Sequence, residues 1–116
     1  MKLFVSNYAS QHKFERFGVL RRVRISRGKD RLGRFDTSVI ELAPSRRLLE
    51  RYRSANIDEN EYAHKYWEEV DPVWRFAVSR LRDGDCLLCF CPVGSPCHRL
   101  LVAERLRKEG HQVVEF

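Results

Sequence analysis

Hydrophobic and polar positions alternate along the first quarter of the chain in a way that predicts short strands. The apolar run at residues 2–6 ends at the turn-prone pair Ser6-Asn7 and predicts an opening strand. Residues 19–25 place Val19, Val23 and other apolar side chains on one face against arginines on the other, which predicts a second strand. Residues 26–37 contain two glycines and four basic residues without an apolar period, so we expect an exposed loop there.

The middle of the chain has the signals of three helices. After an apolar segment at residues 39–42, Pro44 and Ser45 mark the start of a helix in which Ser45 caps the first turn. Asp58 is the expected cap of the next helix. Pro72 fits the first turn of a third helix, whose apolar stripe ends before Gly84.

The last third of the chain predicts a strand, a helix and a strand. Residues 86–91 are apolar on both faces, as in a central strand covered on each side of a sheet. The helix that follows begins at Arg99 and ends near Gly110, and residues 112–116 form the closing strand. This βαβ order predicts parallel strands with a right-handed crossover. We therefore predict an α/β fold with three layers, a mostly parallel sheet, a C-terminal βαβ unit and one domain over residues 1–116.

Composition and cysteine spacing narrow the class of protein. With 116 residues, 43% hydrophobic positions, seven Phe and two Trp, the chain can build one compact core. It shows no apolar run long enough for a signal peptide or a membrane-spanning helix. The four cysteines fall within twelve positions, too close together to staple distant parts of a secreted fold. We therefore expect reduced thiols, a cytoplasmic location and no membrane partner.

The charge points to anionic partners. Twenty-two Lys and Arg against sixteen Asp and Glu leave a net charge of +6, which favours an anionic small molecule or nucleic acid, although a solvated basic surface gives the same count. A phosphate-contacting patch is expected in the basic series of Arg21, Arg22, Arg24, Arg27, Lys29, Arg31 and Arg34. Few aromatics beyond Phe35 interleave with this series, which argues against a stacking platform for single strands.

Loop 91–99 is the expected site of chemistry, because ligands gather beyond the carboxyl ends of strands in such sheets. The first turn of the following helix favours an anion, and Arg99 adds a full positive charge. Cys97 stands beside His98 and Arg99, surroundings that lower a thiol pKa and generate a nucleophilic thiolate. The alternative is that Cys97 only caps or packs the helix, as free cysteines often do.

The same loop offers ligands for a metal. Cys89, Cys91, Cys97 and His98 could form a four-ligand zinc set. Against this, positions i and i+2 of a regular strand are about 6.6 Å apart, farther than two sulfurs on one tetrahedral ion. No cofactor is therefore predicted, with zinc kept as an alternative. A disulfide between Cys91 and Cys97 requires the loop to fold back.

Four side chains are further candidates for a role in the site. His98 is the best general acid or base among the histidines, although a structural role is the commoner one for a histidine. Tyr62, Tyr66 and Glu69 share one helical face and can reach one pocket. In the alternative interpretation the tyrosines belong to the core and Glu69 pairs with an arginine.

Several short motifs occur in the order typical of one known family. They are Arg27-Gly28, Leu42-Ala43-Pro44-Ser45, then Tyr62, Tyr66 and Glu69, and finally Leu87-Leu88-Cys89 with Cys97-His98-Arg99. From about Val19 onward the chain resembles the YeaO-like family of domains of unknown function (DUF488), in its cysteine-histidine-arginine branch. It departs from the family at Ile25-Ser26, in place of Trp-Pro, and at Cys91, in place of an acid. The resemblance implies a compact α/β fold with an unassigned biochemical activity.

Two hypotheses of different classes follow. In the first, the protein is a small enzyme or ligand-binding domain with an anion site at loop 91–99, where Cys97, His98 and Arg99 face a nucleotide or a nucleic-acid component. Arg27 and Arg99 would bind the anion, and Tyr66 and Glu69 would lie opposite. In the second, it is a non-catalytic nucleic-acid-binding or regulatory module whose cysteines are structural or bind a metal.

Overall fold

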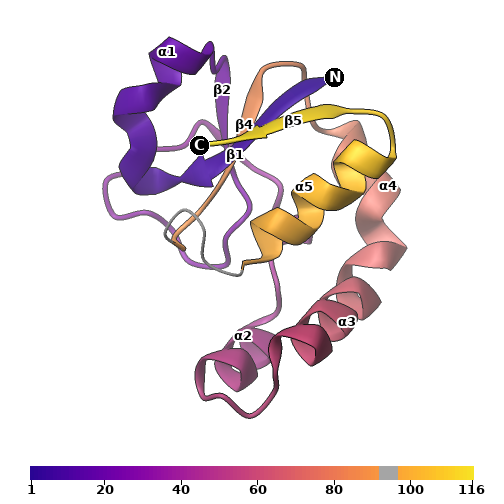
Figure 1. Cartoon of the computed structure of the whole chain (residues 1–116). Coiled ribbons are helices and arrows are strands. Elements are labelled where there is room, and N and C mark those ends of the chain that lie inside the picture. Colours follow the sequence, from indigo (N-terminus) through magenta and orange to yellow (C-terminus); the bar gives the residue numbers. More distant parts are fainter. Residues whose placement is uncertain (92–96) are drawn as a thin grey trace.

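A parallel β-sheet forms the centre of the molecule. The computed structural model describes residues 1–91 and 97–116, and within them five strands pair in the order β3-β2-β4-β1-β5, all parallel (Figure 1). The strands are β1 (Lys2–Asn7), β2 (Arg21–Arg24), β3 (Thr37–Ser38), β4 (Asp85–Cys89) and β5 (Gln112–Glu115). The prediction of an α/β fold with a parallel sheet is confirmed.

Helical segments fill most of the chain between the strands. They are the 3-10 helix η1 (Tyr8–Lys13), α1 (Phe14–Phe17), η2 (Ile40–Leu42), α2 (Arg46–Arg53), α3 (Glu59–Val70), η3 (Asp71–Val73), α4 (Trp74–Ser79) and α5 (His98–Lys108). The predicted caps are confirmed: Ser45 Oγ accepts a hydrogen bond from the backbone N–H of Leu48, and Asp58 accepts one from that of Glu61. No helix among these residues combines the length and the apolar character needed to cross a bilayer.

The predicted third helix differs in extent from the observed one. Helix α4 ends at Ser79, well before Gly84, and Phe76 of the expected inward stripe is exposed. Gly84 instead adopts a positive φ of 87° at the start of β4, and its backbone N–H bonds Lys2 O. A β-carbon on Gly84 would lie 2.6 Å from the side chain of Leu20. This glycine therefore shapes the entry to the central strand.

Side chains on the two faces of the sheet belong to two separate apolar clusters. Leu3, Val5 and Leu87 pack with residues of α2, α3, α4 and α5. Phe4, Cys86 and Leu88 point the other way and pack under η1 and α1 with Tyr8, Phe14 and Phe116. Alternate residues of one strand thus enter opposite layers, as the period of two requires. The three-layer arrangement is confirmed.

Strand β4 lies at the heart of this arrangement. It pairs with β1 on one side and with β2 on the other, and every one of its residues is buried. The prediction of a strand buried on both faces over residues 86–91 is confirmed for residues 86–89, whereas Phe90 lies beyond the strand and is exposed. Strands β4 and β5 are parallel, as predicted, with β1 inserted between them. The carboxyl end of β4 and the amino end of α5 meet at the same edge of the sheet, which is where the candidate site lies.

Candidate functional site

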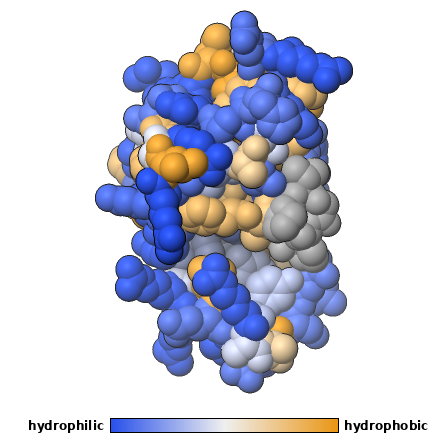
Figure 2. Space-filling model, turned by 90° about the vertical axis from the view of Figure 1, so that its left-hand side faces the viewer, coloured by the Kyte–Doolittle hydropathy of each residue, from blue (hydrophilic) through white to orange (hydrophobic). Residues whose placement is uncertain are grey.

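A cavity of about 330 Å³ opens at the carboxyl edge of the sheet, next to the ends of β2 and β4. One wall comes from loop 26–28 and from residues 89–91, and the opposite wall comes from helix α2. Figure 2 shows a hollow in this face of the molecule, with hydrophilic side chains projecting beside it. The position agrees with the expected location of a ligand beyond the strand ends. Residues 92–96 of the predicted loop 91–99 lie outside the described residues.

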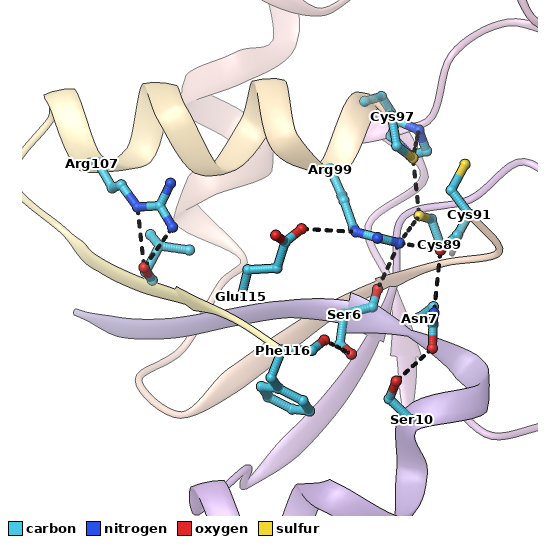
Figure 3. Close-up of polar contacts among 12 residues, drawn as sticks. Ser6, Asn7, Ser10, Cys89, Cys91, Cys97, Arg99, Arg107, Glu115 and Phe116 are labelled. Carbon is cyan, nitrogen blue, oxygen red and sulfur yellow. Dashed lines mark hydrogen bonds and ion pairs between the residues drawn. The ribbon is translucent and has the colours of Figure 1, made fainter. Parts of the chain in front are cut away.

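Three thiols form a cluster in the wall of this cavity. The sulfurs of Cys89, Cys91 and Cys97 all lie within 4.8 Å of one another, and the Sγ atoms of Cys89 and Cys97 are 3.1 Å apart (Figure 3). The regular strand ends at Cys89, so the spacing of a strand, which argued against this approach, does not apply to Cys91. The fourth cysteine, Cys86, points into the opposite core layer, and burial raises its pKa.

Arg99 supports the cluster from inside the molecule. Its side chain is 0% exposed, and its Nη1 donates to Cys89 Sγ at 3.0 Å and to Cys91 O at 2.6 Å (Figure 3). Its Nε lies 3.6 Å from the Glu115 carboxylate. The sequence suggested that Arg99 would bind an anion in the site, but this residue does not reach the lining of the cavity. Its positive charge instead favours a thiolate within the cluster.

His98 is buried and neutral at pH 7. Burial lowers its pKa from 6.5 to about 4. Its Nε2 lies 2.7 Å from Ile25 O and must donate its proton there, so Nδ1 is left as the acceptor, 3.5 Å from Cys97 Sγ. Of the two residues that follow Cys97, Arg99 therefore bears a positive charge at pH 7 and His98 does not. His98 does line the cavity, as does Cys97.

The three thiols differ in acidity. The S–H groups of Cys89 and Cys97, which face the sulfur of Cys91, lower the pKa of Cys91 to about 2, and the positive charge of Arg99 acts in the same direction. The pKa of Cys89 rises to about 11, and that of Cys97 is also raised, because each shares its proton with a neighbouring thiol and both are buried. Cys91 is also the most accessible of the three. The cluster therefore offers its thiolate to the cavity through Cys91.

Cys97 occupies the N-cap position of α5, as expected, but its side chain makes no capping hydrogen bond. Its sulfur instead lies between Cys89 and His98 Nδ1. The backbone thus places Cys97 at the helix start, while its thiol contacts Cys89 in the cluster. This arrangement makes Cys97 a proton-carrying neighbour of the thiolate.

Tyr66 and Glu69 do not reach the cavity. Tyr66 is fully buried and donates its hydroxyl proton to Leu42 O at 2.6 Å, with its ring 5.9 Å from that of His98. Glu69 accepts hydrogen bonds from the backbone N–H of Ser45 at 2.9 Å and from its hydroxyl. Tyr66 thus supports the imidazole from behind, and Glu69 fixes the start of α2. Neither is brought together with the thiols.

The cations around the cavity come mainly from a segment that the sequence reasoning passed over. Arg27 lines the cavity, as suggested, and its Nε donates to Pro44 O at 3.1 Å. Arg46 and Arg53 of helix α2 also line it, and Glu50 is the one acid among the described lining residues. The available signal was the charge density of residues 46–53, in which four of eight residues are arginine. Cavity and cations together suit an anionic ligand.

Most of the predicted basic series is engaged within the protein. Arg21 pairs with Asp85, Arg22 with Asp36 and Arg34 with Asp30. Arg24 donates to the carbonyls of residues 26–28. Of the seven residues in the series, Lys29 and Arg31 are the exposed ones. The internal pairs reduce the positive charge that this series presents to solvent.

Comparison with known proteins yields one match. The family model described as "Active DUF488-N3 subclade" matches residues 3–110, which is nearly the whole chain. No curated protein and no solved structure is matched by the chain. The matched span contains the thiol cluster, Arg99 and the arginines of α2.

Proposed function

The chain belongs to the DUF488 family, and on that premise we propose that it is a small enzyme that holds an anionic substrate in the cavity. The Cys91 thiolate attacks an electrophilic atom of this substrate, and the bond from that atom to its leaving group breaks as the bond to sulfur forms. The observation that carries the proposal is the placement of an acidic, accessible thiol in the wall of a cavity of about 330 Å³ that arginines border. This volume falls within the range of ligand pockets in proteins. The description of the matched subclade as active supports an enzyme.

Each residue of the site has a role in this proposal. Cys91 is the nucleophile, because only the thiolate form of cysteine attacks efficiently. Arg99 stabilises the negative charge of the cluster from the protein interior, through its 3.0 Å contact to Cys89 Sγ. Arg46 and Arg53 hold the anionic group, for which a nucleotide or a nucleic-acid component is the proposed class. Neutral His98 fixes the position of Cys97.

Alkylation tests the proposal directly. We expect iodoacetamide at pH 5–8 to label Cys91 first, with mass spectrometry of the digested protein identifying the site, because a thiolate persists there at pH values where ordinary thiols are protonated. Cys86, buried in the other core layer, provides an internal control that should react only on unfolding. Slow and equal labelling of all four cysteines would overturn the thiolate assignment.

A ligand-protection arm tests the anion site. A nucleoside monophosphate should slow the labelling of Cys91, and the double variant Arg46→Ala, Arg53→Ala should abolish this protection while leaving the unprotected labelling rate of Cys91 nearly unchanged. Arg75→Ala, at an exposed arginine of α4 outside the cavity lining, is the matched control. Absence of protection in the unmodified protein would remove the nucleotide from the proposal while leaving the thiolate in place.

Metal binding is a second candidate function, because the same three sulfurs lie close together. Cys89, Cys91 and Cys97 could hold one zinc ion, since sulfurs on a tetrahedral zinc lie about 3.8 Å apart, given Zn–S bonds of about 2.3 Å. His98, proposed from the sequence as a fourth ligand, is not part of this group among the described residues, and its Nε2 is engaged with Ile25 O. A bound zinc would supply Lewis acidity through its remaining coordination position.

Elemental analysis separates the two candidates. One zinc per chain in the purified protein, lost in Cys89→Ser but kept in Cys86→Ser, would support the metal site. Rapid alkylation of Cys91 in protein that contains no zinc would support the nucleophile. Both measurements use the intact chain.

A further inference from the structure

Helix α2 has a concentration of positive charge that the thiol chemistry alone does not require. Four of its eight residues are arginine, against the single acid Glu50. Arg46, Arg47 and Arg53 are exposed, and among the described residues none of the three takes part in an ion pair. Arg51 approaches Glu61 only at 4.0 Å. Such a helix presents its charge to solvent, in contrast to the paired arginines of β2.

The arginines of α2 lie on two sides of the helix, one facing the cavity and the other facing a second hollow. Arg46 and Arg53 face the thiol cavity. Arg47 and Arg51, one helical turn apart, line a hollow of about 270 Å³ on another side of α2, together with Lys65, Glu68 and Glu69. A free nucleotide in the cavity would contact the first pair of arginines only. A chain of phosphates passing over the helix would contact both pairs.

An aromatic ring lies in the cavity wall beside the thiols. Phe90 is 49% exposed although it follows a fully buried strand, and its ring rests on that of Tyr8 at a centroid distance of 4.7 Å. Gly28 permits this position, since a β-carbon there would come within 3.3 Å of the Phe90 ring. On the opposite wall, Tyr52 and Tyr62 are stacked at 4.3 Å. Exposed aromatics next to cations are the elements with which proteins bind unstacked bases.

We propose that the partner is a single-stranded nucleic acid, whose backbone crosses α2 on Arg46, Arg47, Arg51 and Arg53 and whose bases contact Phe90 at the mouth of the cavity. The proposal rests on the function proposed above and specifies its substrate as a nucleotide within a strand. A hollow with aromatic walls accepts an unpaired base, whereas the bases of a duplex are stacked and paired. Helix α2 is about 12 Å long, enough to follow a short stretch of backbone.

Binding of a fluorescently labelled 12-nucleotide single-stranded DNA, followed by anisotropy between 50 and 200 mM salt, tests the proposal. We expect tighter binding of the single strand than of the matching duplex. The variant Arg47→Ala, Arg51→Ala, which lies outside the thiol cavity, should weaken binding roughly 20-fold at 0.1 M salt and reduce the slope of log K against log salt by about 1.4. Arg75→Ala should do neither.

A second variant separates stacking from charge. Phe90→Leu keeps an apolar side chain, so it should weaken the binding of the strand by roughly 5-fold or more while leaving the salt slope unchanged. Equal affinity for strand and duplex, or unchanged binding by Arg47→Ala, Arg51→Ala, would overturn the proposal. The alkylation rate of Cys91, measured without nucleic acid in the variant Arg47→Ala, Arg51→Ala, should stay unchanged, because neither residue lines the thiol cavity. A strand that fails to bind to protein with a rapidly alkylated Cys91 would therefore refute this inference and leave the proposed enzyme standing.

Discussion

Protonation of His98 should destabilise the fold as the pH falls below 6.5. The imidazole is buried and neutral, with its pKa lowered from 6.5 to about 4 by burial. Because the unfolded chain takes up a proton at higher pH than the folded protein does, acid favours unfolding between these two values. The free energy of unfolding is at its full value above pH 6.5 and is lost progressively down to about pH 4. A difference of 6.5 − 4 corresponds to about 3 kcal/mol.

The measurement is urea unfolding of the wild type and of His98→Gln at pH 7.0 and 4.5. Glutamine keeps an N–H donor near the position of Nε2, which contacts Ile25 O at 2.7 Å, but cannot be protonated in this range. Between the two pH values the wild type should lose about 2 kcal/mol more than the variant does. Carboxylates titrate in both proteins, so the difference isolates His98. Equal losses in the two proteins would refute the assignment of a buried neutral imidazole.

Three further substitutions test the fold around the site by urea unfolding at pH 7. Gly84→Ala should cost about 2 kcal/mol or more, because φ is 87° there and the new β-carbon would meet Leu20, and a cost below 0.5 kcal/mol would contradict this. Tyr66→Phe should cost about 1–2 kcal/mol, since Leu42 O loses its donor, and an unchanged urea midpoint would show that the hydroxyl bond contributes nothing. Asp85→Asn should cost about 3 kcal/mol, because it breaks an ion pair with a fully buried carboxylate, and stability equal to that of the wild type would count against this role.

Local signals allowed much of the fold to be predicted. The caps Ser45 and Asp58 satisfy backbone N–H groups a few residues away, so residue type and position suffice to predict them. The apolar run before Cys89 was enough to predict a strand covered on both faces. The order of the strands depends instead on contacts between distant segments, such as the pairing of β1 with both β4 and β5. Spacing along the chain contains no such information.

The thiol cluster could be predicted only in part. The sequence predicted reactive groups near Cys97. That the Cys91 sulfur comes close to those of Cys89 and Cys97 depends on where β4 ends, which is a property of the whole sheet. The charge of His98 could not be predicted for a related reason, since its pKa is set by burial and by the carbonyl of Ile25, just after β2. The sequence points to cations in the strand and loop before residue 35, whereas the cations that line the cavity lie mainly on α2.

The buried guanidinium of Arg99 couples the edge of the sheet to the thiol cluster. It contacts the carbonyl of Ser6 on β1, the sulfur of Cys89 on β4 and the carboxylate of Glu115 on β5. One rigid planar group thus joins an edge strand, remote from the cavity, to the sulfur atoms. A displacement of β5 would shift this group and change the electric field at the sulfurs. The reactivity of the sulfurs would therefore depend on whether β5 is correctly paired at the edge of the sheet.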